Sequence, residues 1–284
     1  MPSFVNKIGK LFKRQETYKP SDTNQSGAKK SGPKKPKTQA DADAQDAPRR
    51  RKPQGQKGRP QGQRPPQQRR PAKKPSKPWN PDSFKVEPEE GKTRFHDIEL
   101  PDEIMHAVDD LQFKYCTPIQ AEILPLTLAG KDMAGNAQTG TGKTAAFLLG
   151  IFTQFFRNGK GRPALGKPRA LILAPTRELA MQIRDDAEKL GKYTPCRTVA
   201  VYGGIDYDKQ RRLFDDPVDI VVATPGRLID FVQQNVINLG EVDVLVIDEA
   251  DRMLDMGFIP DVRRIIYKTP PKEKRQTLLF SATL

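Results

Sequence analysis

Large apolar side chains are missing from a long stretch near the start of the chain. Between Gln15 and Pro78 the sequence contains no Val, Ile, Leu, Met, Phe or Trp, and Tyr18 is the only aromatic residue there. Such a segment cannot bury enough apolar surface to offset the entropy that is lost on folding. We therefore expect residues 15–91 to form a long disordered tail, and we place one folded domain at residues 92–284.

Cysteine, histidine and long apolar runs are also scarce, and each shortage excludes a class of protein. Cys116 and Cys196 stand alone, which excludes a disulfide framework and favours a reducing, cytoplasmic setting. His96 and His106 lack metal-ligand spacing, so we interpret both as structural or surface residues. No apolar run reaches the roughly 20 residues of a transmembrane helix. Residues 1–14 lack the continuous apolar core of a secretory signal.

Positive charge is concentrated at the N-terminal end. Residues 1–91 hold 23 basic and 9 acidic side chains, whereas residues 92–284 hold 26 of each, so the net charge of +14 belongs to the tail. A flexible basic arm binds nucleic acid by displacing counterions, and it would keep RNA close to the folded domain. A solubilising linker is the alternative interpretation of the same composition.

Residues 1–14 differ from the rest of the tail because they combine apolar and basic side chains. Their apolar members follow helical spacing, with basic residues between them. A short amphipathic helix of this kind would dock on an anionic membrane surface or in the groove of a partner protein. At fourteen residues it would be only marginally stable in isolation.

Short, continuous apolar runs recur through residues 92–284, with helical stretches between them. Runs rich in leucine and β-branched residues are typical of parallel strands that are buried on both faces. Their alternation with helices predicts an α/β domain, a doubly wound parallel sheet with helices on both faces. Polar motifs follow the runs, so we expect them at the carboxyl edge of the sheet, where such sheets bind ligands. The runs are 132–135, 170–173, 198–201, 219–222, 244–247 and 277–280.

A glycine-rich loop follows the first of these runs and precedes a helical stretch. Gly140 and Gly142 let the backbone curl so that its N–H groups point at phosphate oxygens. Lys143 would reach the β- and γ-phosphates, and the Thr144 hydroxyl would bind Mg²⁺. Ala137 stands where the first glycine of this pattern is usual, and a single Cβ is tolerable there. The loop predicted to bind the triphosphate is Ala137, Gln138, Thr139, Gly140, Thr141, Gly142, Lys143 and Thr144.

Two carboxylates follow a later strand that is apolar throughout. Asp248 would hold Mg²⁺ directly or through water. Glu249 would orient the attacking water or accept its proton. Standing alone, this pair would be an ordinary acidic turn. Together with the phosphate loop, it predicts a nucleotide-hydrolysing site in which Lys143, Asp248 and Glu249 are catalytic.

The tetrapeptide Asp248-Glu249-Ala250-Asp251 resembles the name-giving motif of the DEAD-box ATP-dependent RNA helicases. The resemblance covers residues 93–284 and implies a RecA-like fold that uses ATP and Mg²⁺. Two further stretches, 207–210 and 237–240, are most similar to the bacterial RhlB type of this family. The remaining matching motifs are Phe95, Phe113, Cys116 to Gln120, Pro175 to Leu179, Gly203-Gly204, Thr224 to Arg227, and Ser281 to Thr283.

The resemblance implies that ATP is recognised through its adenine. The Gln120 amide both donates and accepts, which suits the N6 and N7 edge of that base. Phe113 or Phe95 would cover the ring face, although core packing explains Phe113 equally well. Gln112 replaces the glycine that usually precedes the motif's Phe, which weakens the expected turn.

The motifs on the other strands imply contacts with one RNA strand. Hydroxyl, backbone N–H and guanidinium groups recognise phosphates and 2′-hydroxyls, so they bind RNA without contacting the base edges that specify sequence. Helix capping is a second role for Thr224 and Arg227. Asp251, Ser281 and Thr283 would couple the nucleotide site to RNA. The predicted RNA-binding residues are Pro175, Thr176, Arg177, Gly204, Thr224 and Arg227.

The family resemblance also implies a second RecA-like lobe after Leu284, so we expect this chain to be a fragment that binds ATP weakly and unwinds nothing alone. With that lobe, RNA-stimulated ATP hydrolysis would drive local unwinding or RNP remodelling, as part of bacterial RNA degradation on an endoribonuclease scaffold. Two alternatives remain open. One is an RNA-annealing chaperone or scaffold that acts through the basic tail, and the other is a DNA translocase.

Overall fold

A computed structural model describes residues 79–137 and 140–283. The predictions for residues 1–14 and for the tail up to residue 78 lie outside the described residues, as do Gln138 and Thr139. The boundary that we predicted at residue 91 is wrong. Phe84 and Val86 are each 8% exposed and belong to the domain core, and Trp79 packs against it. We set our boundary by counting charges. The fold instead begins where large apolar residues resume in the sequence, at Trp79.

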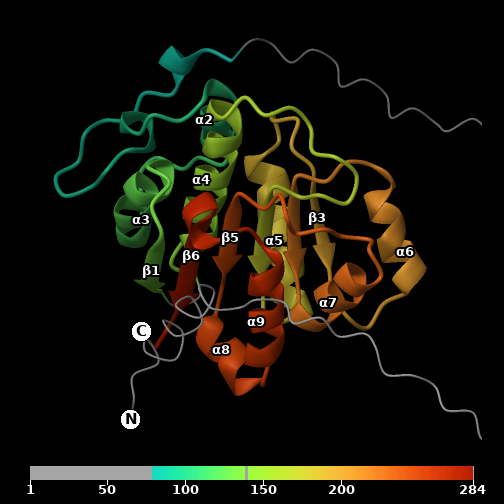
Figure 1. Cartoon of the computed structure of the whole chain (residues 1–284). Helices are drawn as coiled ribbons and strands as arrows, with labels where there is room; N and C mark the ends of the chain where they lie inside the picture. The colour runs from blue at the N-terminus through green and yellow to red at the C-terminus, as the bar shows by residue number, and fades with distance from the viewer. Residues whose placement is uncertain (1–78, 138–139, 284) are drawn as a thin grey trace, which may run out of the picture. The chain divides into compact units, whose positions relative to one another are not determined.

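The domain is built on one six-stranded parallel sheet with the order β1-β6-β5-β2-β4-β3 (Figure 1). The four inner strands are buried along their whole length, as their continuous apolar runs predict, whereas the edge strands β1 and β3 alternate. Each strand lies within one residue of its predicted run. The strands are β1 Met133–Asn136, β2 Ala170–Leu173, β3 Thr198–Val201, β4 Ile220–Ala223, β5 Val244–Ile247 and β6 Gln276–Ser281.

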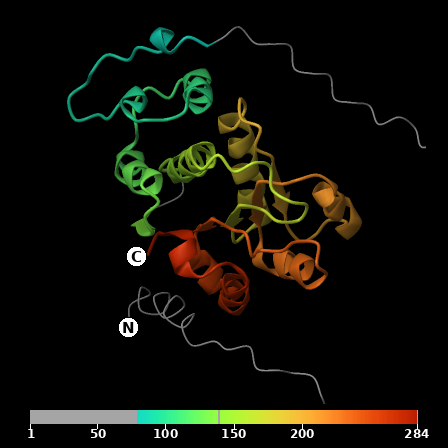
Figure 2. The same ribbon diagram turned by 45° about the horizontal axis from the view of Figure 1, so that its top comes forward.

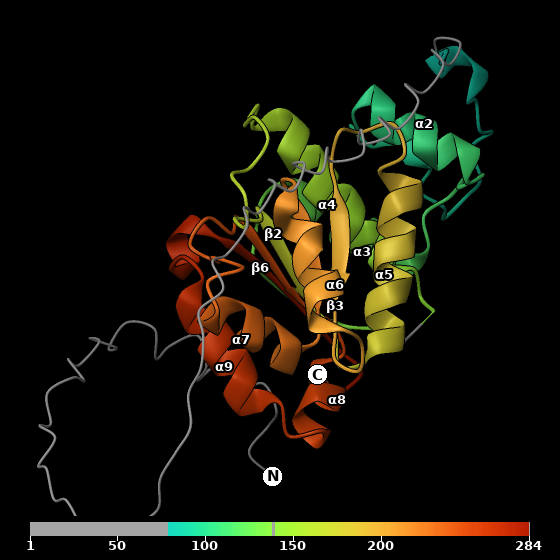
Figure 3. The same cartoon turned by 90° about the vertical axis from the view of Figure 1, so that its right-hand side faces the viewer.

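Helices cover both faces of the sheet, and each face has its own core. Alternate residues of β2 show the division, because Ile172 packs into one core and Leu173 into the other. The first core is closed by α2 Asp102–Asp110, α3 Pro118–Leu128, α4 Lys143–Arg157 and α5 Arg177–Leu190. The second is closed by η4 Arg212–Asp215, α7 Pro225–Gln233, α8 Ala250–Asp255 and α9 Ile259–Lys268. The predicted doubly wound, RecA-like α/β fold is confirmed (Figures 1 and 3).

Parallel strands give the sheet two chemically different edges. The phosphate loop, Thr176, Thr224 and Asp248 all follow strand ends, so they lie at the carboxyl edge. Short segments remain to be placed: α6 Tyr207–Arg211 lies between β3 and β4, and η2 Pro81–Ser83 and η3 Phe95–Asp97 precede α2 (Figure 2). η5 Lys272–Lys274 leads into β6. Within the described part of the chain, no helix combines the length and apolar character needed to cross a membrane.

Candidate functional site: a phosphate loop facing two buried carboxylates

The phosphate loop is held at both of its ends. At its start, the Ala137 N–H donates to the Ser281 carbonyl at 3.1 Å, and the Ala137 side chain is buried without backbone strain. Gly140 and Gly142 have φ values of +81° and +91°, a region that suits only glycine at low cost. The loop ends where α4 begins at Lys143, so the free N–H groups of the first helical turn face the loop.

Lys143 and Asp248 form a buried ion pair, with Lys143 Nζ 2.8 Å from Asp248 Oδ1. Burial raises the pKa of Asp248 above its ordinary value, and the charge of Lys143 opposes that rise. Asp248 Oδ1 also accepts the Glu249 N–H at 2.9 Å, whereas the buried Oδ2 has no partner among the described residues. An orphaned carboxylate oxygen beside a phosphate loop fits a hard cation such as Mg²⁺.

Glu249 is held in an unusual backbone conformation directly after β5. Its φ and ψ are 49° and 52°, the left-handed region, which a residue with a Cβ adopts only when its surroundings impose it. Its carboxylate is largely buried, and Oε2 lies 3.3 Å from Nη1 of the exposed Arg252. The backbone therefore fixes a carboxylate beside Asp248, in the position expected of a residue that orients water.

Gln120 is buried in the first turn of α3, and its amide bonds to the protein backbone. Oε1 accepts the Thr117 N–H at 2.9 Å, and Nε2 donates to the Gly142 carbonyl at 3.1 Å. Thr117 completes this link, because its hydroxyl donates to the Thr141 carbonyl at 2.8 Å. Both ends of the Gln120 amide are therefore engaged, so the adenine contact that we predicted for it would require the bond to Gly142 to be released.

Thr117 is a site residue that our sequence reasoning missed, although a signal was present. Thr117-Pro118-Ile119-Gln120 is a capping box, in which the Thr side chain and the Gln side chain satisfy each other's backbone N–H groups. Proline at the first helical position belongs to the same pattern. The box positions both side chains so that they also reach the phosphate loop.

The two aromatic candidates occupy different positions. Phe95 is fully buried, so it cannot cover an adenine ring in this conformation. The prediction that Phe95 contacts the base is therefore wrong for this structure. Phe113 is only partly buried and packs against Phe95 with ring centroids 6.0 Å apart. Gln112 makes the turn before Phe113 with a φ of 56°, and its side chain donates to the Asp109 carbonyl at 2.9 Å. The turn therefore forms without glycine, and Phe113 keeps the only exposed aromatic face of this pair.

The predicted RNA-binding residues lie on the half of the sheet formed by β2, β4 and β3. Thr176 is the N-cap of α5 and accepts the Leu179 N–H at 3.3 Å. Thr224 occupies the N-cap position of α7, but its side chain makes no capping hydrogen bond. Nη2 of Arg227 donates to the Ile205 carbonyl at 3.1 Å, so the alternative capping role is wrong for both of these side chains.

The other three predicted RNA-binding residues follow β2 and β3. Pro175 is buried, whereas Arg177 and Gly204 are exposed. The Arg177 guanidinium lies 5.7 Å from the ring centroid of Tyr202. Gly204 has a φ of +82° and open space around it apart from Arg177. These exposed groups leave the carboxyl edge free to meet a ligand over β2 and β3.

Asp251 links the segments that follow β5 and β6 through a backbone contact that our prediction did not specify. Its Oδ2 accepts the Ala282 N–H at 3.2 Å. The hydroxyls of Ser281 and Thr283 lie 3.3 Å apart and contact each other. The residues predicted to couple nucleotide and RNA are therefore brought together, with the Ala282 N–H as the group that meets the carboxylate.

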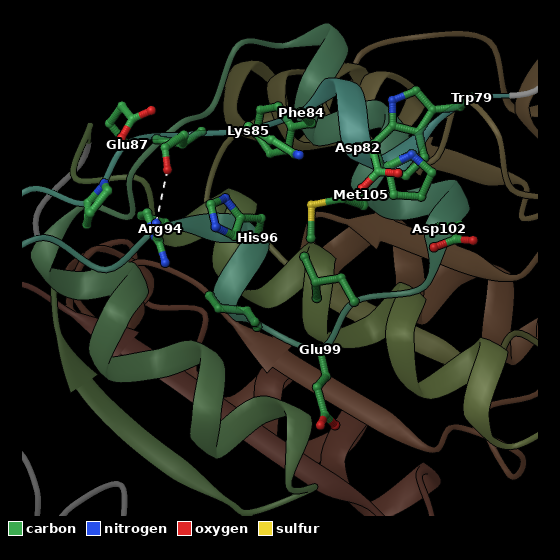
Figure 4. Close-up of a pocket in the computed structure, with 15 residues that line it drawn as sticks. Trp79, Asp82, Phe84, Lys85, Glu87, Arg94, His96, Glu99, Asp102 and Met105 are labelled. Atoms are coloured by element: carbon green, nitrogen blue, oxygen red, sulfur yellow. Dashed lines mark hydrogen bonds between the residues drawn. The ribbon is translucent and has the colours of Figure 1, made fainter.

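A cavity of about 640 Å³ lies away from this edge, between residues 79–88 and the segment that leads into α2 (Figure 4). It contains no phosphate-loop residue. His96 lines it, and Arg94 crosses beside it to donate to the Val86 carbonyl at 3.0 Å. His106 is stacked between Trp79 and Tyr193, with centroid distances of 5.5 and 3.7 Å. Both histidines therefore serve packing at the start of the domain.

Comparisons with known proteins agree with these motifs. The family described as DEAD/DEAH box helicase matches residues 117–284. The ATP-dependent RNA helicase RhlB of Pseudomonas putida is 59% identical over 200 residues, which cover 70% of this chain and 50% of that protein. RhlB of Actinobacillus succinogenes is 52% identical over 193 residues, covering 67% and 46%. The chain spans about half the length of the curated relatives it matches. It belongs to the DEAD-box helicase family.

Proposed function

We propose that this chain is the ATP-binding lobe of an RNA helicase whose ATP hydrolysis is stimulated by RNA. The observation that carries the proposal is the buried pair of Lys143 and Asp248, in which one carboxylate oxygen has no partner among the described residues. Two opposite charges held at 2.8 Å behind a glycine loop suit a ligand that brings both a cation and phosphates.

Nucleotide binding would exchange the contacts that these side chains make with one another. Lys143 would turn from Asp248 to the phosphates, which leaves the carboxylate for Mg²⁺ together with the Thr144 hydroxyl. Gln120 would release the Gly142 carbonyl and pair with adenine, and Phe113 would cover the base. Glu249 would orient the attacking water. Bound Mg²⁺ would neutralise charge on the phosphates during transfer.

The RNA strand would lie across β2, β4 and β3. Arg177 and the open backbone at Gly204 are exposed there, and Thr176, Thr224 and Arg227 follow neighbouring strands. Such groups bind a sugar–phosphate backbone without reading sequence. Asp251, which follows β5, accepts the backbone N–H of Ala282 after β6, and we expect this contact to couple the nucleotide site to the RNA surface that begins at the neighbouring β2.

The matched segment of 193 to 200 residues covers only about half of the related proteins, which are named ATP-dependent RNA helicase RhlB. We propose that the whole protein adds a second lobe that completes both sites, and that it acts in RNA degradation with an endoribonuclease scaffold. On this proposal, the 284-residue chain alone binds ATP weakly and unwinds nothing. RNA-stimulated turnover by the chain alone would refute that expectation.

The test is the ATPase rate against RNA concentration, measured on the protein that includes its second lobe. RNA should stimulate turnover, and Glu249→Gln should abolish it while ATP binding survives. Deleting residues 1–78 should weaken the apparent RNA affinity and leave the maximal rate. If Glu249→Gln leaves unwinding and annealing intact while the deletion abolishes both, the chain is an annealing chaperone that acts through its basic tail, and the helicase proposal fails.

A further inference from the structure

A basic surface lies outside the motif edge, along α9 and the segment that follows it. We define the α9 stripe as Arg162, Arg263, Lys268 and Lys274, all of which are exposed. Arg263 and Lys268 lie on α9, Lys274 ends η5, and Arg162 lies in the loop between α4 and β2. None of the proposed ATP or RNA contacts uses these residues, so their charge needs a separate explanation.

Two members of the stripe that are about a hundred positions apart in sequence lie close together in space. Arg162 and Lys274 line the same open cavity of about 550 Å³, whose other charged residues are Lys160, Arg169 and the acidic Glu241 and Asp243. Arg169 directly precedes β2, and Lys274 lies just before β6, so this cavity is at the amino edge of the sheet. α9 runs toward that edge, because it follows the DEAD motif and precedes η5 (Figures 1 and 3).

Basic side chains outnumber acidic ones in the two chain segments that carry the α9 stripe. Residues 157–169 hold five basic and no acidic side chains, and residues 259–275 hold six basic and two acidic ones. By contrast, residues 79–110 hold three basic and ten acidic side chains. Residues 79–284 hold 27 basic and 30 acidic side chains, so the domain has a net charge of only −3, yet it is strongly polarised. A polyanion would therefore be attracted to the side that carries the α9 stripe.

Fold stability does not account for the stripe. Lys160 and Lys167 nearby are each paired, with Asp243 at 2.8 Å and Glu241 at 2.7 Å. The four stripe side chains show no ion pair or hydrogen bond to another residue in the described part of the chain. Lys268 complements the negative end of α9, but the helix dipole explains none of the other three.

An aromatic side chain lies among these charges. Tyr267 precedes Lys268 on α9 and is 37% exposed, which makes it one of three large exposed apolar residues in the described chain. A ring of this kind offers a stacking face to an unpaired base, and flanking basic groups hold the phosphates. An acidic peptide would use the charges but has no need of the ring.

We propose that the α9 stripe, with Tyr267, is a second site for single-stranded RNA that binds the sugar–phosphate backbone and stacks one base. The site does not include the nucleotide loop, so binding there needs no ATP. RNA that has left or not yet reached the carboxyl edge would be held on the same domain. The stripe is separate from the proposed helicase site, and its test is separate as well.

The test is fluorescence anisotropy of a labelled oligouridylate with the full chain, without nucleotide, at salt concentrations from about 50 to 200 mM. The triple variant Arg263→Gln, Lys268→Gln, Lys274→Gln should reduce the slope of log Kd against log salt by about 2, and weaken binding roughly tenfold at the lowest salt. A matched triple variant on the opposite face, Lys85→Gln, Lys92→Gln, Lys189→Gln, removes the same charge and should change the slope by less than about 0.5.

Variants of Tyr267 distinguish the binding of RNA from the binding of other polyanions. Tyr267→Ala should weaken oligouridylate binding about fivefold, and Tyr267→Phe should retain it, because the ring stacks. All of these positions are exposed, so thermal melting should show unchanged folding. An unchanged salt slope in the stripe variant, or an equal change in the matched variant, overturns the proposal. It is also overturned if Tyr267→Ala has no effect while the stripe variant weakens polyglutamate and oligouridylate alike, which would indicate a surface for acidic proteins.

Discussion

Two buried ion pairs lie at opposite edges of the same sheet. At the carboxyl edge Lys143 meets Asp248 at 2.8 Å, and at the amino edge Arg169 meets Asp219 at 2.6 Å. Each pair is almost completely shielded from solvent. They differ in how far their carboxylate oxygens are satisfied, and this difference separates a binding site from a structural element.

At the amino edge both Asp219 oxygens have partners, although the buried Nε of Arg169 has none among the described residues. Asp219 Oδ2 accepts the Arg197 N–H at 2.9 Å, and Arg169 Nη1 donates to the Lys160 carbonyl at 3.2 Å. The guanidinium also lies 3.9 Å from the ring centroid of Phe155. At the carboxyl edge, Asp248 Oδ2 has no described partner. A buried charge that the protein leaves unsatisfied indicates a ligand.

Removing one cation from each pair should give opposite phenotypes. Arg169→Met leaves Asp219 buried with no counter-charge, and should lower the free energy of unfolding by about 3 kcal/mol. Lys143→Met should cost less stability, because Asp248, whose pKa burial already raises, can take a proton. The same variant should lose at least about 100-fold in ATP affinity. Urea unfolding and calorimetric titration with ATP·Mg²⁺ measure the two effects.

The pH dependence of Lys143→Met follows from the same carboxyl group. A carboxyl whose folded pKa is raised favours folding in its protonated form, so that contribution is present at low pH. It is lost as the pH rises from the ordinary carboxyl pKa through the folded one. Urea unfolding of Lys143→Met and of Lys143→Met/Asp248→Asn across this range should show the loss in the first protein alone. A parallel loss in both would contradict this assignment.

Gly142→Ala tests whether the carboxyl-edge site depends on a backbone conformation that only glycine adopts at low cost. The substituted residue would have a φ of +91°, and its Cβ would lie 2.5 Å from Gln120 Nε2. We expect a cost of about 1 to 3 kcal/mol and weaker ATP binding, because the loop loses its contact with Gln120. Gly161, which has open space around it at the amino edge, provides the control: Gly161→Ala should be close to neutral.

Two threonines at the carboxyl edge should respond differently to loss of the hydroxyl. Thr176 caps α5, so Thr176→Ala should lower the free energy of unfolding by about 1 kcal/mol. Thr224 makes no capping bond, so Thr224→Ala should be within about 0.5 kcal/mol of the parent while weakening RNA binding. Equal stability losses would place Thr224 in the fold rather than at the ligand surface.

The smallest expected effect concerns the two thiols. Burial raises the pKa of both Cys116 and Cys196 to about 11, so neither forms thiolate readily near neutral pH. Iodoacetamide at pH 7 should modify both slowly compared with a free model thiol. Mass spectrometry of the alkylated peptides measures this, and rapid modification of Cys116 alone would reveal opening of the segment that leads into α3.

The fold and the phosphate site could be predicted because their signals are local in sequence. Continuous apolar runs predicted the six strands, and the glycine loop with Asp248 predicted the residues that meet at the carboxyl edge. Contacts between distant segments could not be predicted in this way. The hydrogen bonds of Thr117 and Gln120 to the loop depend on where α3 packs, and the α9 stripe joins loop and helix residues that only the fold brings together.

The most direct test is the thermal stabilisation that ATP·Mg²⁺ gives to the parent chain, Lys143→Met, Asp248→Asn and Arg169→Met. A ligand that binds only the folded state raises Tm, and the rise grows with the logarithm of the ligand concentration divided by its Kd. We predict a rise for the parent and for Arg169→Met, and none for the two carboxyl-edge variants. A rise that survives the loss of Lys143 and Asp248, or that disappears with Arg169, would contradict the assignment of the nucleotide site.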